Sequence, residues 1–215
     1  MEGSWTNSYG DVRENTLGIT CSNITFIGQG KDKTTVHGGI GVRNKKNVTN
    51  GYGLRVEGEE ASVEMLGVYV KACEVAGLYV MNGASVKATQ CEFSENGWSG
   101  VDMSGGSKGI FTDCSIHHNG ESGVWANNEG TLVELRGEQT EIHHNQYGLS
   151  AFSNATINIY IPSRPITALV HDNGDNDLAT NDGGKIQSQL SSSSLELTVI
   201  HPVAPVVDDE DEEDN

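Results

Sequence analysis

Four residues of types that can bind a sugar occupy one position of a repeated pattern. Tyr79, Asp102, Trp125 and Ser150 each follow a Gly-Leu or Gly-Val pair, and all four are expected to point to solvent at successive levels. Aromatic rings stack on apolar sugar faces, and a carboxylate accepts hydrogen bonds from hydroxyl groups. If the repeats stack at the spacing of neighbouring strands, about 4.8 Å, two aromatic rings flank one carboxylate. Tyr79, Asp102 and Trp125 are therefore candidate ligand-binding residues; the alternative is that they merely shield a sheet surface.

A second set of equivalent positions is rich in histidine. His117, His143 and His171 follow Ser94 in this column, and the adjacent positions hold Glu95, His118, His144 and Asp172. Imidazoles beside carboxylates can bind zinc or copper, or act as bases near neutral pH. His117, His143 and His171 are therefore candidate metal ligands, and His117, His143 and Asp102 are candidate catalytic groups. Neighbouring strand residues face opposite ways, so both histidines of one pair are not expected to face the same way, and no resident metal is predicted.

These columns depend on an internal repeat. Shifting residues 84–106 by 23 positions aligns them with the segment that begins at 107. The matched pairs are Cys91 with Cys114, Phe93 with Ile116, Asn96 with Asn119, Gly100 with Gly123, and Val101 with Val124. Weaker matches in both directions predict about seven coils of roughly 20 to 29 residues between Thr20 and Gly184.

The repeat unit is typical of short strands joined by bends. Apolar residues alternate along it, as at Val86 and Ala88, and Gly or Asn interrupts every window in which a helix could form. Such units stack into a solenoid, in which equivalent residues become neighbours. The sequence therefore predicts interior columns and an asparagine ladder formed by Asn96, Asn119, Asn145 and Asn173.

The cysteines are predicted to be thiols. Parallel side chains on adjacent strands keep their Cβ atoms near 4.8 Å, which is beyond the range that a disulfide prefers. Cys91 and Cys114 are therefore expected to be buried, unbridged residues of the core.

The segments "SENGWSGVDMSGG" and "HHNGESGVWANNEG" share the order Asn, Gly, Gly-Val and Gly, which is similar to the generic repeat type "N..G..GV.....G". This order resembles the repeat of the right-handed parallel β-helix superfamily, the pectin-lyase-like fold. The resemblance implies an all-β, right-handed parallel β-helix solenoid. That superfamily includes polysaccharide lyases, hydrolases and epimerases as well as β-helix segments of adaptor and attachment proteins, so the fold alone does not decide function.

The catalytic signatures of these enzymes are missing. The sequence has no "DPHE", no "GHG" and no "RxPxxR". The favoured interpretation is a non-catalytic binding or assembly module that presents a rigid acidic surface to a carbohydrate or a protein. The alternative is a polysaccharide-active lyase, hydrolase or epimerase that uses Asp102.

The net charge of the chain limits the classes of molecule that it is expected to bind. The formal net charge is −17 and the isoelectric point is about 4.6, which disfavours nucleic acid because its phosphates must be neutralised. No cofactor is predicted; Ca²⁺ is the ion that could mediate binding of an acidic glycan. No apolar run is long enough to span a membrane, and no signal peptide is expected, so the sequence predicts a soluble chain and leaves its compartment open.

The chain is expected to divide into three parts. Residues 1–18 form an irregular segment or first coil, residues 19–201 form the β-helix with Leu195–Ile200 as a capping strand, and residues 202–215 form an acidic disordered tail. Because a solenoid ends in unpaired strands, self-association through the ends is also expected.

Overall fold

The fold comes from a computed structural model. It describes the backbone of six short strands before residue 44, and all of residues 51–161 and 163–188.

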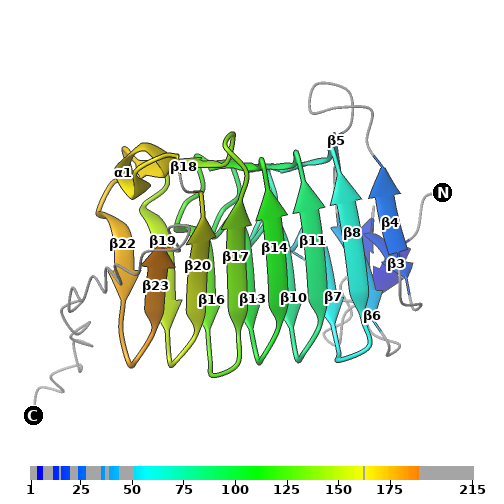
Figure 1. The fold of residues 1–215 in the computed structure, drawn as a ribbon. Coiled ribbons are helices and arrows are strands. Elements are labelled where there is room, and N and C mark those ends of the chain that lie inside the picture. Colours follow the sequence, from blue (N-terminus) through cyan, green and yellow to red (C-terminus); the bar gives the residue numbers. More distant parts are fainter. Residues whose placement is uncertain are drawn as a thin grey trace, which may run out of the picture.

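Three parallel sheets, here called B, C and D, form the walls of the described solenoid (Figure 1). Sheet B contains β3 (Thr16–Ile19), β6 (Gly39–Arg43), β7 (Leu54–Glu57), β10 (Leu78–Met81), β13 (Val101–Ser104), β16 (Ser122–Asn127), β19 (Tyr147–Phe152) and β22 (Asn176–Thr180). Sheet C contains β4 (Ile24–Ile27), β8 (Ser62–Leu66), β11 (Ser85–Thr89), β14 (Lys108–Thr112), β17 (Leu132–Arg136), β20 (Thr156–Tyr160) and β23 (Lys185–Ser188). Sheet D contains β5 (Thr35–Val36), β9 (Tyr69–Lys71), β12 (Glu92–Ser94), β15 (Ser115–His117), β18 (Glu141–His143) and β21 (Val170–His171).

From β7 on, the chain visits the sheets in the order B, C, D and returns to B one level further on. Strands far apart in the sequence therefore pair in parallel, for example β10 with β13 and β13 with β16. Five complete turns run without interruption from β7 to β21, and β22 and β23 begin another. The fold class is confirmed, and the predicted count of about seven coils is slightly high for this continuous part.

Alternating burial explains why these segments form strands. In β11, Val86 and Ala88 point inward whereas Lys87 is exposed. The interior is filled by residues in register from successive turns, among them Val70, Phe93, Ile116 and Ile142. Burying one apolar face of every strand is the main source of stability for such a coil.

The asparagine ladder is confirmed. The side-chain nitrogen of Asn96 donates to Asn119 Oδ1 at 2.8 Å, and Asn119 donates in the same way to Asn145 Oδ1 at 2.8 Å. Asn145 continues the row to Asn173 Oδ1 at 3.1 Å. Each of these oxygens also accepts the backbone N–H of the preceding asparagine. The ladder thus satisfies buried polar groups at the corner between sheets D and B.

Glycine in the repeat motif makes room for this ladder. A Cβ atom at Gly100 would lie 2.8 Å from Asn119 Nδ2 and 2.5 Å from Ile116 Cγ2. A Cβ atom at Gly123 would meet Asn145 and Ile142 at the same two distances. The asparagine of one turn therefore packs against the glycine of the preceding turn, and a larger residue in place of the glycine would clash with it.

Cys91 and Cys114 are buried free thiols, as predicted. The described residues contain one helix, the single turn α1 (Ile166–Leu169), between β20 and β21. None of the helical residues that the structure describes forms a segment long and apolar enough to cross a bilayer.

Some predicted features fall outside the described residues. The capping strand Leu195–Ile200 and the acidic tail 202–215 are among them. Within residues 1–18, β1 (Ser4–Thr6) and β2 (Val12–Glu14) pair antiparallel as sheet A, and β3 already belongs to sheet B. The three-part division of the chain and association through its ends stay predictions.

Candidate functional site

Sheet B brings three of the candidate binding residues together. Tyr79 is in register with Asp102, and Asp102 is in register with Trp125. Because these residues occupy the same outward position on β10, β13 and β16, the two aromatic side chains lie on either side of the carboxyl group. From Tyr79 to Trp125 is two strand spacings, about 9 to 10 Å.

Each of the two aromatic residues stacks on a second ring. The Tyr52 and Tyr79 rings lie 4.6 Å apart with an interplanar angle of 17°. The Trp125 and Phe152 rings lie 4.5 Å apart with an angle of 26°. We call Tyr52, Tyr79, Asp102, Trp125 and Phe152 the aromatic surface. Tyr52 and Phe152 were missed from the sequence because they lie outside the Gly-Leu column, in the loop before β7 and two residues beyond Ser150.

Arg55 extends the column beyond Tyr79. It is in register with Tyr79, and its guanidinium carbon lies 5.3 Å from the centre of that ring. It also donates to Glu57 Oε2 at 3.3 Å. The signal for Arg55 was present in the sequence, since it follows Gly53 and Leu54 just as Tyr79 follows Gly77 and Leu78.

Burial changes the acidity of Asp102. Loss of hydration, with a smaller contribution from the charge of Glu121, raises the pKa of Asp102 to about 7. Near neutral pH this carboxyl group is present in both protonation states, so it can donate or accept a hydrogen bond.

The column does not stay open to solvent along its whole length. Ser150 is in register with Trp125 but is only 1% exposed, contrary to the prediction that it faces solvent. Its hydroxyl group lies 2.9 Å from the hydroxyl of Ser122, and its other neighbour in the row, Ala179, is also buried. The aromatic surface therefore ends at this level.

The histidine column lies on sheet D. His117, His143 and His171 are in register on β15, β18 and β21, and their rings stack at 5.0 Å and 5.5 Å. Ser94 precedes them in register, but it is buried and donates to Glu92. The candidate catalytic residues thus divide between two sheets, with Asp102 on sheet B and the histidines on sheet D.

The two histidines of each pair do contact each other, so the prediction that they face different ways is wrong. His118 and His144 adopt positive φ angles of 55° and 53°, because the chain leaves the strand at this corner. This conformation brings Nδ1 of His118 within 2.9 Å of Nδ1 of His117. The corresponding distance between His143 and His144 is 2.7 Å. The rings of His118 and His144 stack at 4.9 Å.

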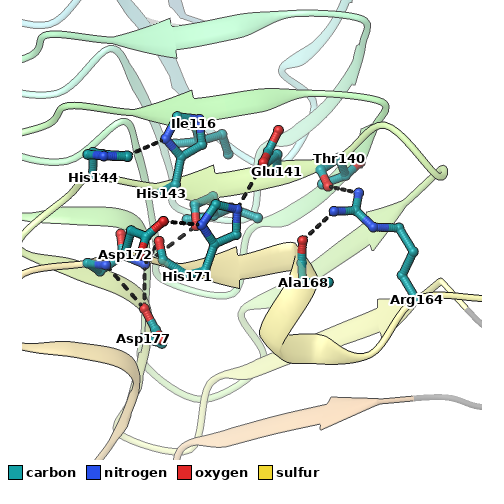
Figure 2. A network of polar contacts seen from close by, with 12 residues as sticks. Ile116, Thr140, Glu141, His143, His144, Arg164, Ala168, His171, Asp172 and Asp177 are labelled. Carbon is teal, nitrogen blue, oxygen red and sulfur yellow. Dashed lines mark hydrogen bonds and ion pairs between the residues drawn. The ribbon is translucent and has the colours of Figure 1, made fainter.

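Carboxylates surround two of the three stacked histidines. Glu92 Oε1 lies 3.3 Å from His117 Nε2. His171 lies 2.9 Å from Asp172 through Nδ1 and 2.9 Å from Glu141 through Nε2, as Figure 2 shows. These hydrogen bonds, to Asp172 first, raise the pKa of His171, whereas burial lowers the pKa of both His117 and His143. Figure 2 also shows Arg164 reaching across to the Thr140 carbonyl group.

Two further observations limit the site. Within residues 51–161 and 163–188, no group of three or more His, Cys, Asp or Glu side chains is arranged to hold a metal ion. A shallow hollow lies on the outward face of sheet C, lined in part by Lys87, Lys108 and Leu132. This hollow contains none of the candidate residues, which lie on sheets B and D.

The three parallel sheets and the inner asparagine ladder define a parallel β-helix. The family model of the right handed beta helix region matches residues 14–163, and the chain belongs to this family. Searches of curated proteins and of solved structures gave no match.

Proposed function

We propose that this β-helix is a non-catalytic carbohydrate-binding module whose glycan site is the aromatic surface on sheet B. The observation that carries the proposal is the position of Asp102 between the Tyr52–Tyr79 and Trp125–Phe152 ring pairs. The rings supply apolar faces for sugars, and the carboxyl group bonds to hydroxyl groups.

The backbone of the site supports binding with little loss of conformational freedom. Tyr79, Asp102 and Trp125 stand on paired strands, and their backbones are held by hydrogen bonds to the turns on both sides. A site that is already ordered loses less entropy when a ligand binds.

Charge favours neutral glycans. The chain carries a net charge of −17, so an acidic polysaccharide would be repelled unless Ca²⁺ bridged the two. We therefore expect neutral polysaccharides to bind without added metal.

The test is a glycan array followed by calorimetric titration, with and without Ca²⁺. Trp125→Ala should weaken binding of a neutral oligosaccharide about tenfold, because it removes one stacking face. Trp98→Ala is the matched control, since Trp98 is 55% exposed and lies outside the aromatic surface. The proposal fails if no glycan binds, or if both variants bind as the unchanged protein does.

A second candidate function is supported by the acidity of Asp102. A carboxyl group with a pKa of about 7 is suited to act as a general acid in a polysaccharide-active enzyme, with Glu121 as a nearby second carboxylate. In that case, incubation with the bound glycan releases new chain ends at a steady rate. Loss of this turnover in Asp102→Asn, with glycan binding retained, would favour the enzyme over the binding module.

A further inference from the structure

The imidazole pairs at the corner after sheet D have a geometry that their sequence positions did not predict. His117 and His118 bring two Nδ1 atoms to 2.9 Å, and His143 and His144 bring theirs to 2.7 Å. Without a metal, one Nδ1–H of each pair donates to the other Nδ1. A metal ion that replaces this proton can be bound by both Nδ1 atoms of the pair, which then occupy two adjacent positions of its coordination sphere.

The nitrogen spacing selects among metals. Two imidazole nitrogens, each about 2.0–2.1 Å from one ion and separated by the observed distance, subtend an angle of roughly 80–90°. A tetrahedral ion needs a wider angle. Angles near 90° belong to square-planar or tetragonal Cu²⁺ and Ni²⁺, and Cu²⁺ is the divalent ion that nitrogen ligands bind most tightly.

A carboxylate distinguishes the first pair from the second. Glu92 Oε1 faces Nε2 of His117 at 3.3 Å, which favours the tautomer with its proton on Nε2 and leaves the Nδ1 lone pair available. Carboxylates in this position orient metal-binding histidines and increase their basicity. In the next turn, His143 takes the place of His117 and Ser115 takes the place of Glu92. The position that holds a carboxylate next to His117 therefore holds a serine next to His143.

The neighbouring histidine is unsuited to bind a cation. Both nitrogens of His171 face carboxylates, those of Asp172 and Glu141, so both are engaged as donors when this ring is protonated. Of the histidines at this corner, His117 and His118 therefore form the pair whose Nδ1 lone pairs are best oriented for a metal ion.

We propose that His117 and His118 bind one Cu²⁺ ion through their two Nδ1 atoms, with water completing its coordination. Two protein ligands make this an open site, which agrees with the lack of any enclosed group of three ligands in the described part of the chain. Binding of a second ion at His143 and His144 is opposed by the first, because the stacked rings lie only 5.0 Å apart. The site is on a different sheet from the aromatic surface and does not depend on the proposed function.

The experiment titrates the full chain with Cu²⁺ alone, by calorimetry and by electron paramagnetic resonance. The unchanged protein should bind one equivalent tightly, with a spectrum that shows nitrogen coordination. His118→Asn should lower the Cu²⁺ affinity at least tenfold; asparagine is chosen because it tolerates the positive φ angle of His118. Zn²⁺ should bind more weakly than Cu²⁺.

Two further variants test the assignment. Asp172 occupies the corner position of His118 two turns further on. Asp172→Asn should therefore keep the Cu²⁺ affinity within about twofold. Glu92→Gln should weaken binding about tenfold, a typical effect of losing a carboxylate behind a metal-bound histidine. The circular dichroism spectra should match throughout. Unchanged Cu²⁺ affinity in His118→Asn, or Zn²⁺ binding as tight as Cu²⁺ binding, overturns the proposal.

Discussion

A carboxyl group that stands between aromatic rings on a sheet surface loses part of its hydration. For Asp102 this loss raises the pKa from 3.8 to about 7. The folded chain thus keeps a proton on Asp102 that the unfolded chain releases above about pH 4. Folding becomes less favourable, through this one group, as the pH rises from 4 to 7, and the effect levels off above the folded-state pKa.

Asp102→Asn removes this titration while keeping nearly the same shape. At pH 4 the variant and the unchanged protein should have nearly equal free energies of unfolding. At pH 8 the variant should be more stable by about 1–3 kcal/mol, since an amide does not have to be buried as a charge. Urea denaturation at the two pH values measures the difference.

The control for this measurement is Glu129→Gln, at an exposed turn between β16 and β17. It should change the free energy of unfolding by less than about 0.5 kcal/mol. An equal stability gain at pH 4 and pH 8 in Asp102→Asn would contradict burial of the charge as the cause.

Among the elements, the turn between sheets D and B carries the asparagine ladder and the closest glycine contacts of the repeat motif. Its asparagine side chains run parallel to the solenoid and bond to those of the next turn, as Asn119 does to Asn145. Gly100 and Gly123, four residues after Asn96 and Asn119, and Gly148, three residues after Asn145, let the next asparagine approach. Where both residue types are present, the side-chain ladder and the close approach of successive turns occur together.

Gly123→Ala tests this requirement. The added Cβ atom would lie 2.5 Å from Ile142 Cγ2 and 2.8 Å from the carbonyl oxygen of Gly148, so backbone must move. We expect the free energy of unfolding to fall by about 2–3 kcal/mol, as for other overpacked core positions. Thermal or urea unfolding measures the change.

Gly174→Ala is the matched control, because a Cβ atom there meets nothing closer than 3.7 Å. That variant should differ from the unchanged protein by less than about 0.5 kcal/mol. If the two alanine variants were equally stable, close approach to the ladder would not be the reason for the glycine.

In the molecule as a whole, residues at equivalent positions of successive repeats lie next to one another and form rows along the solenoid. The outward row of sheet B carries Tyr79, Asp102 and Trp125, whereas the row of sheet D carries histidines. A single rigid solenoid can therefore present separate surfaces to different ligands. The solenoid also carries a strong negative charge, which acts on every partner at long range.

This charge predicts that the chain does not bind nucleic acid. In a mobility-shift assay at low salt, roughly 50 mM, neither duplex DNA nor single-stranded RNA should be retarded, since binding at low salt depends on cations that neutralise phosphates. A basic protein of similar size serves as the positive control. Retardation at low salt that disappears at higher salt would contradict this prediction, because it would show that the protein has a local cationic surface despite its negative net charge.

The repeat in the sequence was sufficient to predict the fold class and the rows. Asn96 and Asn119 occupy the same place in consecutive repeats, and in a parallel solenoid the same place means adjacent strands. The same reasoning placed Tyr79, Asp102 and Trp125 in register. It would also have found Arg55, which follows a Gly-Leu pair earlier in the chain.

Other features could not be predicted, because they depend on contacts between different positions of the repeat. Ser150 is buried against Ser122 rather than exposed, and Phe152 stacks on Trp125 from the next turn. The pairing of His117 with His118 depends on a positive φ angle at the corner, which alternation along a strand does not predict.

The sequence by itself determined the right-handed β-helix, its ladders and the order of residues along each row, because the distance between paired strands is nearly constant. The tertiary structure alone decided where the outward row becomes buried, as at Ser150, which rings pair and how acidic Asp102 is. Those properties follow from how the corners turn and what covers each side chain, and neither is encoded in the period of the repeat.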